Sequence, residues 1–180
     1  MRLEKLFWSK SKVSILIYLL FKREGISLRA LEKDLNWTFP AIKKQIDALL
    51  EGEIITIDKS GIKRSIFLAN PYKKHIKNIF LFSIASDIQG FCKTYNDKIY
   101  NLYYGKTFWA LLPMDLVIIH NIENTNSVNY LKEWIATIFR AYYIDNVALT
   151  TMTQKERDQR YRLADKFVLS IMKDNIVLDK

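Results

Sequence analysis

The chain has 180 residues, 49% of them hydrophobic and 26% charged, with a net charge of +9. This composition is typical of a globular protein and excludes a disordered tail, while the single cysteine, Cys92, excludes an intramolecular disulfide framework. The chain begins without the apolar core of a secretory signal, and no apolar run approaches the ~20 residues that span a bilayer, so we expect a cytoplasmic protein with no membrane partner. The positive charge favours nucleic acid or another polyanion as partner.

The first predicted element is an apolar helix that begins at Ser9 or Ser11 and ends at Glu24-Gly25. Serine is a favoured N-cap, and glycine often ends a helix. Apolar side chains cover most of the circumference, so we expect this helix to be buried; they are Val13, Ile15, Leu16, Tyr18, Leu19, Leu20 and Phe21. Ile26 is predicted to form a short extended link.

Two further helices follow this link. Ser27 is the predicted N-cap of a helix over Leu28–Leu35, and Thr38 is the predicted N-cap of a helix that ends at Gly52. The third helix has Pro40 in its first turn, where a missing N–H group does no harm. Spacings of three and four predict its buried stripe, formed by Ile42, Ile46, Leu49 and Leu50.

A β-hairpin is predicted next, from the β-prone runs Ile54–Asp58 and Arg64–Ala69 on either side of a tip that contains Gly61. Three helices and a hairpin are the order of a winged helix-turn-helix. Residues 9–58 resemble the winged-helix repressors of the arsenic-repressor and multiple-antibiotic-resistance type. The resemblance lies in the apolar first helix, the Leu-x-x-Leu second helix, the polar turn, and Ala-Ile-x-x-x-Ile-x-x-Leu before Gly52.

The resemblance implies that the third helix enters the major groove of double-stranded DNA while the hairpin contacts the adjacent backbone or minor groove. The side of the helix opposite its apolar stripe must face outwards. The predicted DNA-contacting residues are Thr38, Ala41, Lys43 and Lys44 on the helix and Lys59, Lys63 and Arg64 on the hairpin. The alternative is a winged helix that contacts protein and whose lysines are merely solvated. Asp47 on the same helix is a point in favour of that alternative.

Asn70-Pro71 marks a predicted boundary between a domain over residues 1–70 and a second over residues 71–180. The second domain is predicted to be α/β. Its expected helices cover about Tyr72–Tyr95, Ser127–Tyr143 and Gln154–Met172, and its expected strands cover Ile99–Tyr104, Met114–Ile119, Asn146–Thr150 and Ile176–Leu178. In the helix that starts at Ser127, the predicted buried stripe is Leu131, Trp134, Ile135, Ile138 and Tyr142.

This order of elements resembles the minimal nucleotidyltransferase domain, a small relative of DNA polymerase beta. That family has Gly-Ser after one strand, Asp-x-Asp on the next and a third acidic residue on a later strand. By this resemblance, Gly105-Lys106 stand at the Gly-Ser position, Pro113 and Asp115 at Asp-x-Asp, and Asn146 at the third acidic position.

These positions predict a vestigial site. Nucleotidyl transfer needs clustered carboxylates to hold two magnesium ions. Asp115 is the one expected carboxylate in place, because Pro113 supplies no ligand, Asn146 is not acidic, and the fixed charge of Lys106 would lie near the metals. We therefore expect a catalytically inactive domain with no cofactor and no metal.

Other candidate residues have ordinary structural interpretations. We expect Cys92 to lie in the core, His75 to be solvated, and His120 to have no partner acid. The charged run Lys155–Arg162 is predicted to be a solvated helical face with i,i+4 ion pairs, and its arginines are weaker candidates for contact with DNA or an acidic partner. The aromatic residues of 95–109 are predicted to form either core or a subunit interface.

The expected fold class is thus α+β, with a winged helix-turn-helix followed by a small nucleotidyltransferase-like α/β domain. The expected function is transcriptional regulation by a homodimer that binds double-stranded DNA, since one small module makes few DNA contacts. The second domain would serve dimerisation, a protein partner or ligand sensing. One alternative is an active nucleotidyltransferase or antitoxin-like enzyme with Asp115 and Asp145 as surviving ligands. Another is an adaptor that binds proteins alone.

Overall fold

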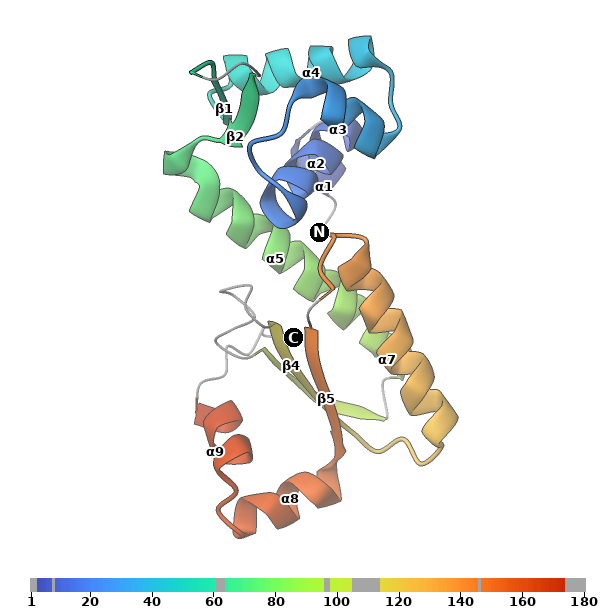
Figure 1. Ribbon diagram of the computed structural model, residues 1–180. Helices are drawn as coiled ribbons and strands as arrows, with labels where there is room; N and C mark the ends of the chain where they lie inside the picture. The colour runs from blue at the N-terminus through green and yellow to red at the C-terminus, as the bar shows by residue number, and fades with distance from the viewer. Residues whose placement is uncertain are drawn as a thin grey trace. The chain divides into compact units, whose positions relative to one another are not determined.

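The computed structural model describes residues 3–7, 9–60, 64–95, 98–104, 114–145 and 147–173, and at positions 4, 5, 100, 114 and 115 it describes the backbone alone. The fold is mixed α+β with two small sheets (Figure 1), in agreement with the expected class. The chain divides into two compact units, Met1–Ser83 and Ile84–Lys180. The division lies inside the long helix α5 (Asn70–Cys92), so the first turns of α5 belong to the first unit.

The first unit begins with a short helix, α1 (Leu3–Leu6), that the sequence did not predict. The predicted apolar helix follows as α2 (Lys10–Ile17) and continues into a π-helical turn, η1 (Tyr18–Lys22). Of the two candidate N-caps, Ser9 takes the role, because its side chain accepts a hydrogen bond from the N–H of Lys12 at 3.3 Å.

The next two helices have the predicted bounds, α3 (Leu28–Leu35) and α4 (Phe39–Glu51). Ser27 caps α3 by accepting a hydrogen bond from the N–H of Ala30, as predicted. The core of this unit is apolar and is formed by α2, η1, α3, α4 and α5; among its most buried residues are Ile15, Leu16, Leu19, Leu31, Ile42, Ile46, Leu49 and Phe80. The buried stripe of α4 thus follows the predicted helical spacing.

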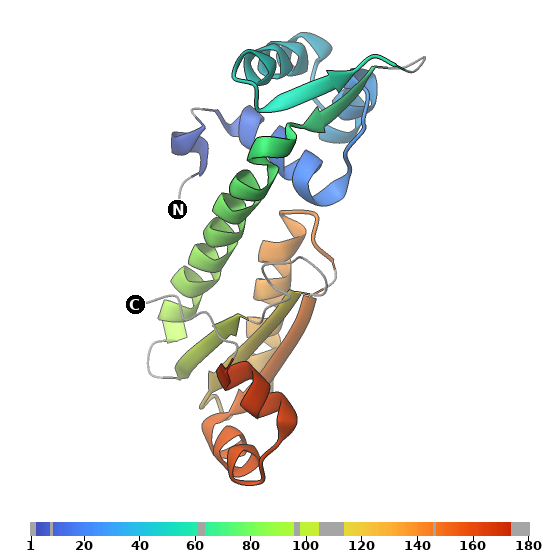
Figure 2. The same cartoon turned by 90° about the vertical axis from the view of Figure 1, so that its left-hand side faces the viewer.

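The predicted hairpin is present as β1 (Ile55–Asp58) and β2 (Ser65–Leu68), which pair antiparallel (Figure 2). The predicted extended link at Ile26 adds to this sheet. Its carbonyl accepts a hydrogen bond from the N–H of Ile66 at 2.9 Å, and the N–H of Gly25 donates to the carbonyl of Ile66 at the same distance. Gly25 has φ +67°, and a Cβ there would lie about 3.1 Å from the Phe67 ring, so glycine fits this position.

The second unit contains a three-stranded sheet in the order β3 (Ile99–Tyr104), β4 (Met114–His120), β5 (Val147–Thr153). The outer strand β3 is antiparallel to β4, whereas β5 is parallel to β4. The parallel connection runs through the helix α7 (Thr125–Arg140), which makes a β-α-β unit.

Helices cover both faces of this sheet. In Figure 2 α7 lies behind the strands and α9 (Lys166–Lys173) in front. The front face buries Tyr103, Val117, Ile119 and Met152 against Val168 of α9. On the other face the hydroxyl of Tyr104 donates to the carbonyl of Ala85 in α5. Because Leu116–Ile119 of β4 is buried on both sides, this part of the strand is a continuous apolar run rather than an alternating one.

Several predicted bounds in this unit were wrong by a few residues. The helix α7 begins at Thr125, two residues before Ser127, because the side chain of Asn124 accepts a hydrogen bond from the N–H of Asn126 and caps the helix. The strand β5 continues to Thr153, three residues past the predicted end, because its parallel pairing with β4 persists to the pair His120–Thr153.

The predicted helix over Gln154–Met172 is two helices, α8 (Gln154–Arg162) and α9. Ala164 has φ +53°, which is incompatible with a helix, and Asp165 starts α9 by accepting hydrogen bonds from the N–H groups of Phe167 and Val168. The predicted strand Ile176–Leu178 lies outside the described residues.

Candidate nucleic-acid interface

The candidate interface is built on α4, and its local sequence explains how the helix is presented. Thr38 is the N-cap residue, with extended backbone angles, and Pro40 lies in the first turn. Ile42, Ile46 and Leu49 anchor one side of the helix in the core. The rest of the circumference is therefore available to solvent.

The predicted contact residues on α4 are all exposed: Thr38, Ala41, Lys43 and Lys44. The predicted orientation of the helix is thus confirmed. Asp47, whose negative charge disfavours DNA binding, is exposed as well. No hydrogen bond joins the Thr38 side chain to the first turn of α4, so its hydroxyl is not used for capping.

Charge is distributed unevenly along α4. The two lysines lie in the N-terminal half, whereas the acidic residues Asp47 and Glu51 lie in the C-terminal half. Within the described part of the chain, neither Lys43 nor Lys44 is within ion-pair distance of a carboxylate. The N-terminal half therefore presents uncompensated positive charge, next to the partial positive charge of the helix N-terminus.

The hairpin places further cations on the same unit. Lys59 and Arg64 are exposed at the ends of β1 and β2, and Lys63 lies outside the described residues. The N–H of Ser60 donates to the carboxylate of Asp58 at 2.8 Å. This bond and the Ser60 hydroxyl lower the pKa of Asp58. The acidic group is thus used to shape the turn after β1.

The base of the hairpin is fixed by Glu24. One oxygen of its carboxylate accepts a bond from the N–H of Leu68, at 3.4 Å, and the other lies 2.6 Å from the ammonium of Lys73 in α5. Glu24 therefore joins the segment after η1 to strand β2 and to the start of α5. It holds the hairpin to the rest of the unit.

Two exposed residues of the first unit were not predicted from the sequence. Phe39, the first residue of α4, is 38% exposed although it is a large apolar residue. Arg29 is exposed in the first turn of α3. Phenylalanine is usually buried, so the sequence did not predict that Phe39 is exposed. Arg29 could have been found from its position on α3, the helix that precedes the turn between α3 and α4.

The predicted vestigial site is largely outside the described structure. Gly105, Lys106, Pro113 and Asn146 are not among the described residues. The backbone of Asp115 lies in β4, opposite Ala148 of β5. Among the described side chains, no three His, Cys, Asp or Glu residues gather in a way that would hold a metal ion.

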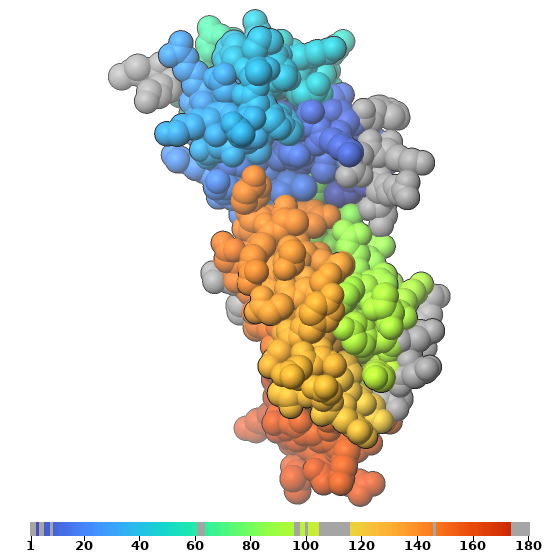
Figure 3. Space-filling model, turned by 90° about the vertical axis from the view of Figure 1, so that its right-hand side faces the viewer, coloured from blue at the N-terminus to red at the C-terminus, as the bar shows by residue number. Residues whose placement is uncertain are grey.

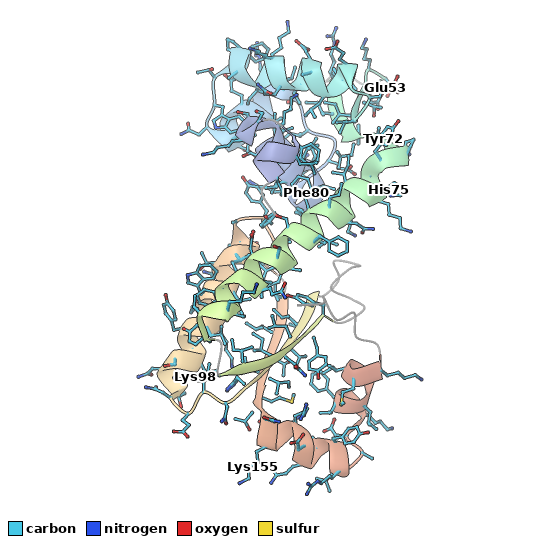
Figure 4. The ribbon with its side chains drawn as sticks, turned by 180° about the vertical axis from the view of Figure 1, so that it is seen from behind. Glu53, Tyr72, His75, Phe80, Lys98 and Lys155 are labelled. Atoms are coloured by element: carbon cyan, nitrogen blue, oxygen red, sulfur yellow. The ribbon has the colours of Figure 1, made fainter. Side chains whose placement is uncertain are left out.

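The remaining single candidates take structural roles. Cys92 is buried, and burial raises the pKa of its thiol to about 12, so the predicted core role is confirmed. His120 is buried too, and its Nδ1 accepts a hydrogen bond from the N–H of Ile122. Burial lowers the pKa of His120, which favours the neutral ring. His75 is exposed on α5, as predicted (Figure 4).

The charged helix α8 pairs its acidic residues internally. Arg160 lies 2.8 Å from Glu156, at the predicted i,i+4 spacing, and Arg157 Nε donates to Asp158 at 2.8 Å. Burial disfavours the charge of Arg157, but Asp158 and Tyr103 outweigh it and raise the pKa of the guanidinium. Lys155 remains on the outer side of α8 (Figure 4).

An aromatic cluster lies between α5 and α7, which are side by side on the surface in Figure 3. The rings of Phe91 and Trp134 stack at 3.8 Å, and Tyr95 and Tyr130 lie against Phe91. The prediction that Trp134 belongs to the buried stripe was wrong, since it is 38% exposed and stacks at the surface. Phe139, further along α7, is fully buried in that stripe. Of the aromatic segment, Tyr103 and Tyr104 belong to the core.

No helix among the described residues combines the length and the apolar character needed to cross a bilayer. No protein-family model, curated protein or solved structure matches this chain.

Proposed function

We propose that this protein is a DNA-binding transcriptional regulator. In this proposal the first unit is a winged helix-turn-helix that places the N-terminal half of α4 in a major groove and its hairpin against the flanking backbone. The second unit is a catalytically inactive nucleotidyltransferase-like domain that joins two copies or binds a partner.

The observation that carries the proposal is the pair of exposed lysines, Lys43 and Lys44, which have no ion-pair partner among the described residues and lie on the outward half of α4. A lysine that is already paired has little to gain from a phosphate. An unpaired one releases counterions from DNA and contributes directly to affinity. Thr38 and Ala41 border these lysines and are small enough for close approach to base edges.

The sheet of the first unit also supports the proposal. The segment at Ile26 pairs with β2, which pairs with β1. In the proposed winged helix-turn-helix, this small antiparallel sheet packs beside the three helices as the wing. Lys59 and Arg64 flank the tip of this sheet and are exposed. Cations at both the helix and the hairpin suit a duplex, whose phosphates lie on both sides of a groove.

The test is a gel-shift titration of a mixed-sequence duplex at low ionic strength. Lys43→Ala together with Lys44→Ala is expected to abolish duplex binding, because two phosphate or guanine contacts are lost. In any residual binding, the slope of log K against log salt should fall by about 2, since each phosphate contact contributes about 0.9. The circular dichroism spectrum should not change, because both side chains are exposed.

The matched control is Lys166→Ala together with Lys173→Ala on α9, which removes the same charge from two other exposed positions. This variant should bind the duplex as tightly as the wild-type chain. If both double variants lose affinity equally, net charge alone explains the binding. If neither does, α4 is not the DNA-contacting helix, and the proposal fails.

A further inference from the structure

Strand β5 is the outer edge of the sheet in the second unit. It pairs with β4 on one side, from Val147–Met114 to Thr153–His120. Within the described part of the chain, no strand pairs with its other side. Figure 2 shows β5 at the border of the sheet. Alternate N–H and C=O groups along this strand therefore point away from the sheet.

The sequence of β5 itself, which the structure describes in full, has none of the usual features that prevent pairing. Proteins protect edge strands with charged side chains, proline, bulges or short length. Strand β5 has seven residues, Val-Ala-Leu-Thr-Thr-Met-Thr, with no charge and no proline. Its pairing with β4 is regular over its whole length. In the opposite edge strand, β3, the register with β4 shifts between Ile99 and Asn101.

The faces of β5 are at least half-buried at every residue except Ala148, so its edge is the part that remains open among the described residues. Met152 is buried, and the other β5 residues except Ala148 are half-buried. A partner at this edge would thus meet backbone hydrogen-bonding groups rather than a large apolar surface. A strand satisfies such groups best, because it offers donors and acceptors at the same spacing.

A second copy of β5 is complementary to the first. Two identical strands related by a two-fold axis pair antiparallel, and every contact occurs twice. An axis at the central residue, Thr150, pairs all seven residues and places Val147 opposite Thr153 of the second copy. The cross-strand pairs then include threonine with threonine and β-branched with β-branched, which are favourable.

Charge at the ends of the strand fits the same register. Asp145 precedes β5 and is exposed, and Lys155 follows it and is exposed too. Within the described residues neither has an ion-pair partner. With the axis at Thr150, Asp145 of one copy lies beyond the same end of the paired strands as Lys155 of the other. Each end of the interface therefore carries an acidic residue from one copy and a basic residue from the other, which favours the pairing.

We propose that β5 pairs antiparallel with β5 of a second copy about a two-fold axis at Thr150, so that the two sheets become one continuous sheet. The inference deepens the proposed function, since it names how the second unit would join two copies. Its test uses no DNA. A failure here is therefore distinguishable from a failure of duplex binding by α4.

The first experiment is a disulfide scan of the full-length chain. Thr150→Cys places two cysteines directly opposite each other across the axis, where the Cα atoms of paired antiparallel residues are about 4.5–5.5 Å apart. This lies within the range that a disulfide spans. Mild oxidation should give a covalent dimer on non-reducing gels. The wild-type chain is the negative control, because its single cysteine, Cys92, is buried and should not form a crosslink.

Thr153→Cys is the matched control. In the proposed register Thr153 lies opposite Val147 of the second copy, so the two substituted positions are six residues apart along the strands, or about 20 Å. They should not crosslink. Equal crosslinking in both variants would mean random collision and would overturn the register. Absence of crosslinking in Thr150→Cys would overturn the interface, provided that the oxidised chain keeps its circular dichroism spectrum.

Light scattering gives an independent readout. Ala148→Lys adds a charge at the exposed position of β5, and it should convert a dimer into a monomer. Thr137→Lys adds the same charge at an exposed position of α7 and should leave the dimer unchanged. A wild-type chain that is monomeric at high concentration, or a dimer that persists in Ala148→Lys, contradicts the proposal.

Discussion

Helices α4 and α8 are both exposed on one side and rich in charge, but they use their cations differently. On α8, Arg160 and Arg157 are paired with Glu156 and Asp158 of the same helix. On α4, Lys43 and Lys44 precede the acidic residues of the helix and pair with none of them. Both helices also carry two exposed cations outside these ion pairs. Lys43 and Lys44 are adjacent in one half of α4, whereas Lys155 and Arg162 lie at opposite ends of α8, so the position of the unpaired cations separates the two helices.

The two helices also differ in how they are anchored, and the largest expected effect follows from this. Ile46 of α4 is 1% exposed, while no residue of α8 is buried. Ile46→Ala should lower the free energy of unfolding by about 2–5 kcal/mol, because it removes buried methylene groups and leaves a cavity. Urea denaturation followed by circular dichroism measures this loss.

Tyr161→Ala is the matched truncation on α8. Its ring is 51% exposed, so we expect a change within about 0.5 kcal/mol. If Tyr161→Ala destabilises the protein as much as Ile46→Ala does, α8 is anchored as firmly as α4, and the contrast in anchoring between the two helices is wrong.

The N-caps of the two helices allow a sharper test, because both are threonine. The side chain of Thr153 accepts a hydrogen bond from the N–H of Glu156 at 3.1 Å, whereas Thr38 makes no such bond. Thr153→Ala should therefore cost about 1 kcal/mol of stability, and Thr38→Ala should cost clearly less. Thermal unfolding measures both.

Duplex affinity should show the opposite order for these two variants. Thr38→Ala should weaken DNA binding in a gel shift, because its hydroxyl is available for a phosphate, and Thr153→Ala should leave it unchanged. A large loss of stability in Thr38→Ala would show that its hydroxyl caps α4 after all and is not available to DNA.

The first unit could be predicted from sequence because its signals are local. The N-caps Ser9 and Ser27 and the stripe Ile42, Ile46, Leu49 act within one helix each, and the structure agrees with all of them. The bridge from Ile26 to β2 was missed, since the pairing of Ile26 with Ile66 depends on a contact between distant residues. The local sequence pattern predicted that Ile26 is extended, but it did not predict which strand Ile26 pairs with.

The errors in the second unit also come from contacts between residues that are distant in the sequence. The end of β5 depends on how far β4 extends beside it. Trp134 lies at the surface, where it stacks on Phe91 of another helix. Periodicity assigns residues to a face of a helix and does not say where the core ends on that face. The exposure of Lys43 and Lys44 was predicted because it follows from the opposite, buried stripe.

The smallest expected effect concerns the ion pair on α8. Glu156 and Arg160 are each about half exposed, so water and salt screen their attraction. A double-mutant cycle with Glu156→Gln and Arg160→Gln should give a coupling energy of about 0.2–0.5 kcal/mol, decreasing as salt is added. Arg160→Gln should leave duplex affinity unchanged, because the guanidinium is already paired. If Arg160→Gln weakens binding as much as loss of the α4 lysines, paired cations contribute to DNA binding as well, and the distinction between the two helices is lost.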